Sequence, residues 1–466
     1  MQQGNASPFR AELGATLRLA APLALANVLQ MAVYAVDVIF VARLGQEALA
    51  ASSLSVALFG LMNWSFAGLT GAVAPLVAAE MGRRKHAVRE VRRSVRMALW
   101  LAILCGLAGM VVCSFGEEIM LATGQEPRIA ERAGSFLHIL QFAMIPMIAS
   151  NVLRIFVSAL GRPVFATAIT GLAIIVNAVG NYALVFGNLG APELGLEGSA
   201  LASSITAVAT FLTYCIAIRT NRRLHRYRVF GRFWRTEWTR FRELVKIGTP
   251  IALTVAAEGG LFGGAAFLMG LIGESELAGH TVALQICAFA FQVPFGIAQA
   301  ATIRVGFHYG AADAAGIARA GKAALIAGIG FMAFPAALML LAPKFILGAY
   351  VDVADPANAA MIGFAVHFLA IGAAFQLFDG TQTVAAGVLR GLQDTRVPMI
   401  MALSGYWLGG FATAVILGFL TPLQGIGVWI GLAVGLVIVS ALLLRRWQLR
   451  DRLGLVPTAS ARARTA

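Results

Sequence analysis

Three carboxylates occupy places where the sequence leaves little water to solvate them. Asp37, Glu258 and Asp379 each lie inside a long apolar run, at least about two helical turns from its ends. A charged side chain at the bilayer centre costs about 2.5 to 3.5 kcal/mol on insertion scales, so such residues usually face a wet cavity or a partner. These acids are therefore the first candidates for binding a cation. The alternative for each is a structural hydrogen bond at a helix interface.

The acids need a cation because no basic residue is expected at a comparable depth. A proton would neutralise a carboxylate directly, and Na⁺ would be held by carboxylate, amide and hydroxyl oxygens, as other hard cations are. Either ion suits the chemistry, at Asp37 or at Glu258 with Asp379. Four basic residues all fall near expected helix ends: Arg43, Arg154, Arg304 and Arg390.

Amide and hydroxyl side chains recur at helical spacing in two other apolar runs. Asn177 and Asn181, in "IIVNAVGNYALVF", stand four residues apart and share one helix face. Ser199 and Ser203 follow in "GLEGSALASSI", where small residues such as Gly198 allow close backbone approach. These side chains could line an ion or substrate site. The alternative is helix packing through interhelical hydrogen bonds.

The elements that must position these residues are membrane-spanning helices. Of the 466 residues, 59% are hydrophobic and only 12% are charged, which indicates an integral membrane protein. A helix needs about 20 apolar residues to cross a bilayer, and the period-2 alternation of a barrel strand is absent, so we predict an all-α bundle. Twelve spans are expected: 15–43, 50–79, 95–116, 132–159, 164–187, 196–219, 244–272, 277–308, 321–342, 359–389, 398–420 and 425–445.

The net charge of +14 reports orientation in the membrane rather than binding to nucleic acid. Basic residues cluster in alternate loops, above all between residues 219 and 246, and the opposite loops are short or acidic. Cytoplasmic loops carry the excess of Lys and Arg, so both termini are predicted to be cytoplasmic. We expect a multi-pass protein of the bacterial inner membrane. A nucleic-acid partner is not expected, since no separate folded domain carries the basic clusters.

No cofactor site is expected from the sequence. The four cysteines lie within apolar spans without C-x-x-C spacing, which argues against a metal cluster. A G-x-x-x-x-G-K-[ST] phosphate loop is absent, and no loop is long enough to house a nucleotide-binding domain. If the protein moves solute uphill, it must use an ion gradient. The coupling ion, Na⁺ or H⁺, is therefore the only bound ion that we expect.

A single fixed offset, without a gap, relates the two halves of the chain. It aligns Pro22 with Pro250 and Gln30 with Glu258, and glycine pairs follow at the same offset over about 60 residues. Gln30 thereby joins the site candidates. Each half has six spans, so the two pseudo-symmetric lobes form a parallel repeat about an axis along the membrane normal. The expected parts are a cytoplasmic N-terminal segment (1–14), an N-lobe (15–219), a basic cytoplasmic linker (220–243), a C-lobe (244–445) and a cytoplasmic tail (446–466).

Two such lobes are typical of a carrier, in which rocking exposes a cavity between the lobes to each side in turn. Pro22 and Pro250 are expected about one or two turns inside their helices, where the missing N–H and the ring clash permit a bend. They are predicted as helix hinges, and the alternative is a static kink. We expect the protein to work as a monomer surrounded by membrane lipid.

Three stretches resemble the multidrug and toxic compound extrusion (MATE) family of antiporters, close to its NorM branch. They are "YAVDVIFVARLG" around Asp37, "PIALTVAAEGGLF" around Glu258, and "FQLFDGTQTVAAGVLRGLQDTRVPM" from Asp379 into the next loop. The resemblance spans residues 10 to 445 or so. It implies a twelve-helix, two-lobed exporter that expels organic cations and related amphipathic drugs in exchange for Na⁺ or H⁺.

The resemblance also implies roles for single residues. Asp37 matches the family's first-lobe acid, where ion binding is proposed together with polar residues that fall on Asn177 and Asn181. Glu258 and Asp379 match the second-lobe acids, which are implicated in binding cation or substrate.

The chain departs from this family at two places. Phe375 stands one turn before Asp379, where the NorM branch often has a tyrosine, so a hydroxyl is missing there. Asn181 stands where some relatives have an acid, which could change which ion is preferred.

Other functions fit the sequence less well. A lipid-linked precursor flippase of the same superfamily has a similar two-lobe plan, but such proteins often have cationic cavities that suit pyrophosphate, and three acids argue against one. A membrane enzyme such as a prenyltransferase would need clustered Asp pairs for Mg²⁺, and no D-D-x-x-D-like stretch occurs. A channel would show downhill current far above carrier rates. We therefore predict a secondary active multidrug efflux transporter without enzymatic activity.

Overall fold

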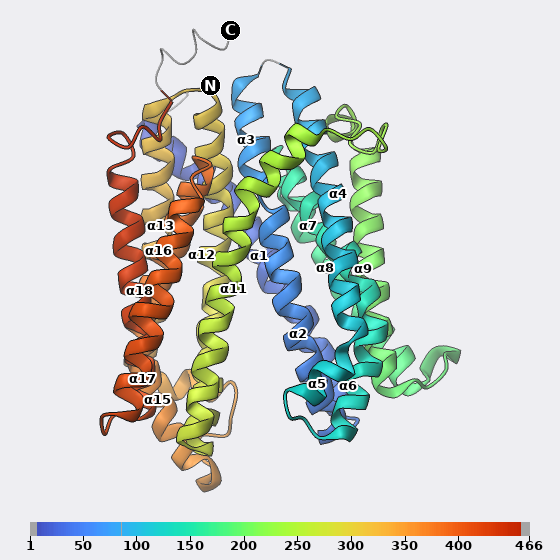
Figure 1. The fold of residues 1–466 in the computed structure, drawn as a ribbon, viewed down its shortest axis with the longest axis vertical. Coiled ribbons are helices and arrows are strands. Elements are labelled where there is room, and N and C mark those ends of the chain that lie inside the picture. Colours follow the sequence, from blue (N-terminus) through green and yellow to red (C-terminus); the bar gives the residue numbers. More distant parts are fainter. Residues whose placement is uncertain (1–6, 85, 458–466) are drawn as a thin grey trace, which may run out of the picture. The chain divides into compact units, whose positions relative to one another are not determined.

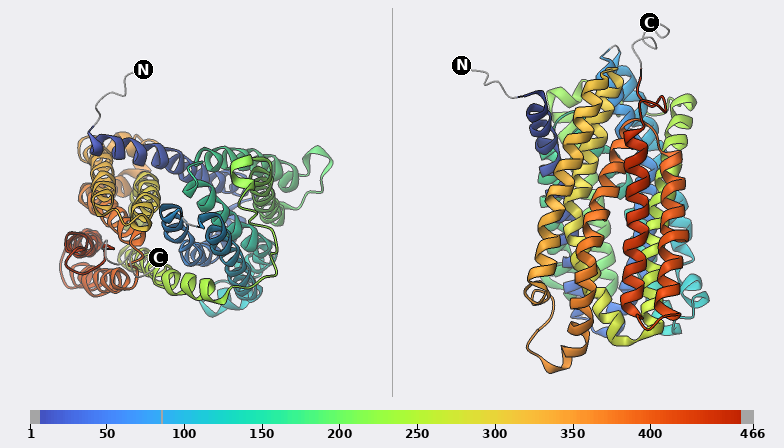
Figure 2. Two further views of the ribbon diagram at one scale, coloured as in Figure 1. Left: turned by 90° about the horizontal axis from the view of Figure 1, so that it is seen from above. Right: turned by 90° about the vertical axis from the view of Figure 1, so that its left-hand side faces the viewer.

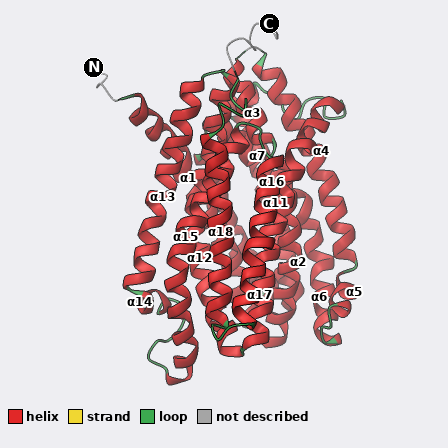
Figure 3. Ribbon diagram, turned by 60° about the vertical axis from the view of Figure 1, so that its left-hand side comes forward, coloured by secondary structure: helices red, strands yellow, loops and turns green. Residues whose placement is uncertain are grey.

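The computed structural model describes residues 7–84 and 86–457, and this part of the chain is helical without a strand (Figure 1). Parts of three predicted segments lie outside the described residues: positions 1–6 of the N-terminal segment, Lys85 of a basic loop, and 458–466 of the tail. Figure 3 shows that mostly short loops join the helices. The all-α prediction is confirmed for the described chain.

Twelve helical segments of the described chain are long and apolar enough to cross a membrane, as predicted. They are α1 (Pro8–Ala42), α2 with α3 (Gln46–Thr70, Val73–Arg83), α4 (Ala87–Ser114), α6 with η1 and α7 (Pro127–Leu140, Gln141–Ala143, Met144–Ala159), α8 (Val164–Phe186), α9 (Gly195–Thr220), α11 (Trp238–Ile272), α12 (Glu274–Gly310), α13 (Ala314–Leu341), η3 with α15 (Pro356–Asn358, Ala359–Gly391), α16 with η4 and α17 (Arg396–Leu403, Ser404–Phe411, Ala412–Phe419), and α18 (Gly425–Gln448). Short helices in the loops are α5 (Gly116–Ala122), η2 (Asn188–Gly190), α10 (Arg222–His225) and α14 (Pro343–Leu347).

Several helices begin earlier than the apolar runs predicted. Helix α1 begins at Pro8 rather than at residue 15, and α4 begins at Ala87 rather than at residue 95. Hydropathy detects only the part of a helix that suits hydrocarbon, whereas Arg, Glu and Lys also continue a helix well. With α1 beginning at Pro8 and α11 at Trp238, Pro22 and Pro250 lie more than three helical turns inside their helices. The expectation of one or two turns for these prolines was therefore wrong, and their hinge role stays a prediction.

The chain forms two compact units. One holds the described residues up to Ala24 and those from Leu253 onward, and we call it the C unit; the other runs from Leu25 to Ala252, and we call it the N unit. Each boundary falls inside a helix, close to Pro22 in α1 and close to Pro250 in α11. The start of each of these two helices therefore belongs to one unit and the remainder to the other.

In the C unit, α15 packs against α12, α13 and α18, and Figure 2 shows these helices side by side. Small residues bring α12 and α15 close together, because a Cβ atom at Gly387 would lie 2.6 Å from the carbonyl oxygen of Ala298. Across the same contact, the hydroxyl of Thr302 donates to the carbonyl oxygen of Gly387 at 2.8 Å. This packing fixes the part of α15 that carries Asp379.

In the N unit, α8 and α9 lie in close contact. A Cβ atom at Gly198 would lie 2.3 Å from the carbonyl oxygen of Leu184, and one at Gly180 would lie 3.1 Å from the Cβ atom of Ala202. The close backbone approach predicted at Gly198 is confirmed. It brings the asparagine face of α8 against the serine face of α9.

Candidate functional site

The first group of predicted site residues meets around Asp37 in the N unit. Carboxylate atom Oδ1 of Asp37 accepts hydrogen bonds from Nδ2 of Asn177 at 3.0 Å and from Nδ2 of Asn181 at 2.8 Å. Its other oxygen, Oδ2, accepts from the hydroxyl of Ser203 at 2.8 Å. One carboxylate on α1 is thus enclosed by donors from α8 and α9, which we call the Asp37 cage.

The local sequence explains this geometry. Asn177 and Asn181 are one helical turn apart, so both project from one face of α8, and both side chains are fully buried. A bond from Nδ2 of Asn181 to the backbone carbonyl of Asn177, at 3.0 Å, holds the second amide in place. The close α8–α9 contact at Gly198 then positions Ser203 against the same carboxylate.

Two oxygen atoms beside the Asp37 cage have no hydrogen-bond partner among the described residues. They are Oδ1 of Asn181 and the hydroxyl of Ser199, and both residues are fully buried. Ser199 lies one turn before Ser203 on α9. Buried polar atoms are nearly always hydrogen-bonded, so these two oxygens are candidates for contact with a water molecule or an ion. The predicted candidate Ser199 thus lies on the helix that also supplies Ser203.

Gln30 does not join this group in the structure. It lies on α1, seven residues before Asp37, and is half-buried. Its side chain makes no hydrogen bond to the part of the chain that the structure describes. The repeat aligned it with Glu258, and only Glu258 has a polar partner in this structure.

The second group meets in the C unit around an amide. Nε2 of Gln382 donates to Oε1 of Glu258 at 2.9 Å and to Oδ1 of Asp379 at 3.1 Å. Because both carboxylate oxygens contact the same nitrogen, the two acids lie close enough for their charges to interact directly. The hydroxyl of Tyr406 donates to Oε1 of Gln382 at 2.5 Å. We call this group the paired-acid site.

Sequence reasoning missed Gln382 and Tyr406. Gln382 carried a usable sign, since it is a polar residue one turn after Asp379 in an apolar run. Tyr406 carried none, because it reaches Gln382 from η4, a π-helical stretch that hydropathy does not reveal. Such stretches are frequent at functional sites.

Phe375 supplies no hydroxyl, as the sequence indicated, and is fully buried against the rings of Phe262 and Trp429. The hydroxyl at the paired-acid site comes from Tyr406 instead, through Gln382.

One expectation about charge needs correction. No basic residue was expected at the depth of the acids, yet the guanidinium of Arg390 is an electrostatic neighbour of Glu258. Arg390 lies near the end of α15, eleven residues after Asp379. Side chains on a helix lean toward its N-terminus, which is the direction of Asp379 from Arg390. Glu258 is therefore less isolated than its sequence context suggested.

The described residues contain no cluster of three or more His, Cys, Asp or Glu side chains that could hold a metal ion. A Na⁺ ion in the Asp37 cage would have to take its other ligands from amide and hydroxyl oxygens, which hard cations accept.

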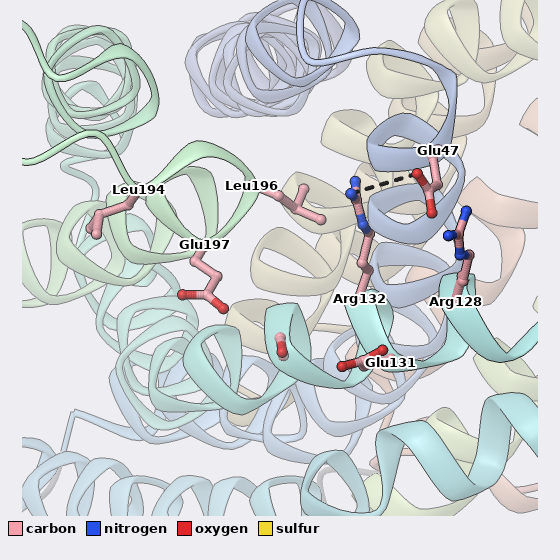
Figure 4. A pocket seen from close by; sticks show the side chains of 8 residues that line it. Glu47, Arg128, Glu131, Arg132, Leu194, Leu196 and Glu197 are labelled. Atoms are coloured by element: carbon pink, nitrogen blue, oxygen red, sulfur yellow. Dashed lines mark ion pairs between the residues drawn. The ribbon is translucent and has the colours of Figure 1, made fainter.

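A separate hollow in the N unit, of about 580 Å³, holds none of the predicted site residues. Figure 4 shows its charged side chains, with Arg132 directed at Glu47 across an ion pair of 3.5 Å. About half of each side chain is exposed, and exposed pairs contribute little to stability. The lining residues are Glu47, Arg128, Glu131, Arg132, Ser135, Leu194, Leu196 and Glu197.

Twelve membrane-length helices in the described chain, with carboxylates held inside them by amides and hydroxyls, define the class of the protein. It is a multi-pass membrane transport protein. Buried intramembrane acids of this kind mark ion and substrate pathways.

Comparisons with known proteins give the family. The MatE family model matches residues 22–183 and 250–416, two segments that begin at the prolines which the internal repeat aligns. The chain is 46% identical over 445 residues to "Probable multidrug resistance protein NorM" of Mesorhizobium japonicum, covering 96% of this chain and 95% of the relative. It is 42% identical over 444 residues to the protein of the same name from Brucella suis, covering 95% and 94%. The chain therefore belongs to the MatE family, whose members are transporters and not enzymes.

Solved structures share the fold. A crystal structure of a eukaryotic MATE transporter superposes with a TM-score of 0.88 at 19% identity, covering 98% of this chain and all of that one. An outward-facing multidrug resistance MATE family transporter of the MOP superfamily gives 0.85 at 20% identity, covering 96% and 97%. With its bacterial relatives, the chain is a multi-pass inner-membrane protein, and the side on which its termini lie stays a prediction.

Proposed function

We propose that the protein is a secondary active multidrug efflux transporter that exchanges Na⁺ or H⁺ for organic cations and related amphipathic drugs. The observation that carries the proposal is the Asp37 cage, a carboxylate inside an apolar helix held by Asn177, Asn181 and Ser203. The multidrug resistance names of the relatives support the choice of substrate. No bound cofactor other than the coupling ion is needed.

The Asp37 cage suits two states of the carboxylate. With both amide nitrogens and a hydroxyl directed at it, ionised Asp37 has three donors and needs no bound cation. If the amides of Asn177 and Asn181 turn by half a rotation, their oxygens face the carboxylate and complete an oxygen site for Na⁺. The unpartnered hydroxyl of Ser199 is a further ligand in that state. A proton on Asp37 would displace one donor in the same way.

The paired-acid site would bind the organic cation or a second coupling ion. Glu258 and Asp379 share one amide donor, so two negative charges there would repel each other at short range. A cation that binds between them removes this repulsion. Exchange requires that ion and drug favour different states of the transporter, because a ligand shifts an equilibrium only by its difference in affinity for the two states.

Neither site supports the alternative function, a lipid-linked precursor flippase. Both are lined by carboxylates, amides and hydroxyls, which do not suit a pyrophosphate group. Arg390 is the one charged nitrogen group with an electrostatic contact to the paired-acid site among the described residues, and Glu258 offsets it.

The proposal is tested by transport in proteoliposomes. Ethidium export is measured under a Na⁺ gradient without a pH gradient, and then under the reverse condition. We expect Asp37→Asn and Asp379→Asn to abolish export under the gradient that drives the wild type. Glu118→Gln, at an exposed acid of α5, is the matched control and should export normally. Unchanged export by both site variants would overturn the acid-centred mechanism.

A further inference from the structure

His280 is a buried titratable residue that the two sites leave unused. It lies on α12, is 1% exposed, and neither ring nitrogen has a hydrogen-bond partner among the described residues. Among the described residues, no acidic side chain forms an ion pair with it. Its ring packs edge-on against Trp429 of α18, with 5.6 Å between ring centroids. A histidine without any partner is unusual in a protein interior.

Two other polar atoms of the same region also lack a partner within the described chain. They are the indole Nε1 of Trp429 and the side-chain oxygen Oε1 of Gln376, and both residues are fully buried. Gln376 lies on α15, and its Nε2 donates to the backbone carbonyl of Cys287 on α12 at 3.0 Å. Unpartnered atoms thus occur on three neighbouring helices, since α15 packs against both α12 and α18.

The chemistry of these atoms identifies their partner. An indole N–H can only donate, an amide oxygen can only accept, and a neutral imidazole offers one donor and one acceptor. A partner shared by these atoms must therefore both donate and accept, which Na⁺ cannot do. Phe368 stacks on Trp429 at 5.8 Å between ring centroids, and Phe375 packs edge-on at 5.6 Å, so apolar rings fill the surroundings. Water fits both requirements, and buried waters typically make about three hydrogen bonds.

These residues form a line that ends at Asp379. His280 lies six residues after the start of α12, and at about 1.5 Å per residue that is about 9 Å from the helix end. Cys287 follows two turns deeper on the same helix, and Gln376 binds its carbonyl. Gln376 and Asp379 are three residues apart and share one face of α15. The thiol of Cys287 is also an electrostatic neighbour of Asp379.

We propose that His280, Trp429 and Gln376 hold a short chain of water molecules that conducts protons between Asp379 and the end of the C unit where α12 begins. His280 accepts a proton at one ring nitrogen and releases the proton of the other nitrogen to the next water. That water protonates the Asp379 carboxylate, and the steps reverse when Asp379 releases its proton. On α12, Glu276 lies one turn before His280 and Cys287 two turns after it; α15 carries His367 and Asp379, and α18 places Trp429 against the ring.

This inference rests on the proposed function, since it needs Asp379 to exchange protons. It goes further by naming the route and by assigning the C unit to proton coupling. His280 is a proton-transfer residue in this scheme, whereas Trp429 and Gln376 position the water.

The test uses the full-length protein in proteoliposomes without Na⁺, with a pH-sensitive dye inside. Proton movement on addition of ethidium is followed for the wild type, His280→Met, His280→Gln, Asp379→Asn and His367→Met. His367 is an exposed histidine on α15 and serves as the matched control. We expect His280→Met to slow proton movement by about 10-fold or more, because positioned acid–base groups contribute at least that much to proton transfer. His367→Met should resemble the wild type.

Two further measurements separate this role from a structural one. Ethidium affinity and thermal unfolding of the purified His280→Met protein should stay close to wild type, and His280→Gln, which keeps hydrogen-bonding groups, should recover the fold if His280→Met loses it. Radiolytic hydroxyl labelling in H₂¹⁸O should label Trp429 in the wild type despite its burial. Absence of label at Trp429 would overturn the water chain.

The outcomes also separate this inference from the proposed function. Lost proton movement in Asp379→Asn with normal movement in His280→Met would overturn the relay and leave the proposed function intact. Normal movement in Asp379→Asn would also overturn the relay, because the relay would then have no destination, and it would leave Asp37 as the proton site of the proposed function. Slow movement in both variants, with normal movement in His367→Met, supports the relay.

Discussion

Glu12 and Arg240 occupy equivalent positions of the internal repeat, carry opposite charges, and each anchors the start of its helix. In the C unit, Oε2 of Glu12 lies 2.6 Å from Nη2 of Arg304 and 3.3 Å from Nε2 of His308. In the N unit, Nη2 of Arg240 lies 2.9 Å from Oε1 of Glu80, and Glu80 is the repeat equivalent of His308. Both halves of the repeat therefore have a polar contact at these positions, but the acid lies on the first helix in one half (Glu12) and on the partner helix in the other (Glu80).

These anchors hold the parts of α1 and α11 that precede the unit boundaries near Pro22 and Pro250. We expect Arg240→Ala to lower the free energy of unfolding by about 3 kcal/mol, because Glu80 is almost fully buried and would lose its best-shielded partner. Unfolding of the purified protein by heat or denaturant measures the effect. Arg83→Ala is the control, since Arg83 also contacts Glu80 but is half exposed, and it should cost less than about 1 kcal/mol. Equal losses would contradict the anchor.

Asn181→Asp is expected to strengthen coupling to Na⁺. It places a second carboxylate where Nδ2 of Asn181 now lies 2.8 Å from Oδ1 of Asp37. The two carboxylates would repel each other, and a bound cation would remove this repulsion. The Na⁺ concentration for half-maximal ethidium export should fall. Asn188→Asp, at a half-buried position of η2 outside the cage, should leave it unchanged. A weaker dependence on Na⁺ in Asn181→Asp would contradict a role of this cage in ion binding.

Gln382→Met is expected to reduce export more than Tyr406→Phe does. Gln382→Met removes the donor that Glu258 and Asp379 share. Tyr406→Phe removes one hydrogen bond to Gln382, worth about 1 kcal/mol, which corresponds to a roughly fivefold lower export rate. Initial rates of ethidium export under the driving gradient measure both. Tyr182→Phe, at an exposed tyrosine of α8, is the control. If Tyr406→Phe were the more damaging change, Gln382 would not organise the site.

The sequence predicted those features that depend on local composition and spacing. Apolar runs located the spans, and the four-residue spacing of Asn177 and Asn181 placed both amides on one face of α8, where Asp37 receives them. Ser203 was found because small residues mark close helix contacts, and Gly198 makes such a contact.

Features that depend on three-dimensional packing were not predictable. Tyr406 reaches Gln382 from the π-helical stretch η4, and Arg390 on α15 is an electrostatic neighbour of Glu258 on α11, far away in the sequence. The unit boundaries inside α1 and α11 follow from which helices pack together, and hydropathy carries no such information. The unpartnered nitrogens of His280 likewise become visible only when its surroundings are known.

The contact between α8 and α9 should be essential to the Asp37 cage, because it alone sets the distance between the asparagine and serine faces. Gly198→Val would force a side chain into a space where even a Cβ atom lies 2.3 Å from the carbonyl oxygen of Leu184. Overpacking of this kind typically costs about 1 to 3 kcal/mol, and it would move Ser203 away from Asp37. We expect a lower unfolding temperature and a weaker response to Na⁺. Gly171→Ala, on α8 with no neighbouring atom within 4 Å of its Cβ position, should be neutral or slightly stabilising, since alanine favours helix over glycine. A Gly198→Val protein with normal stability and normal response to Na⁺ would show that the cage does not depend on this contact.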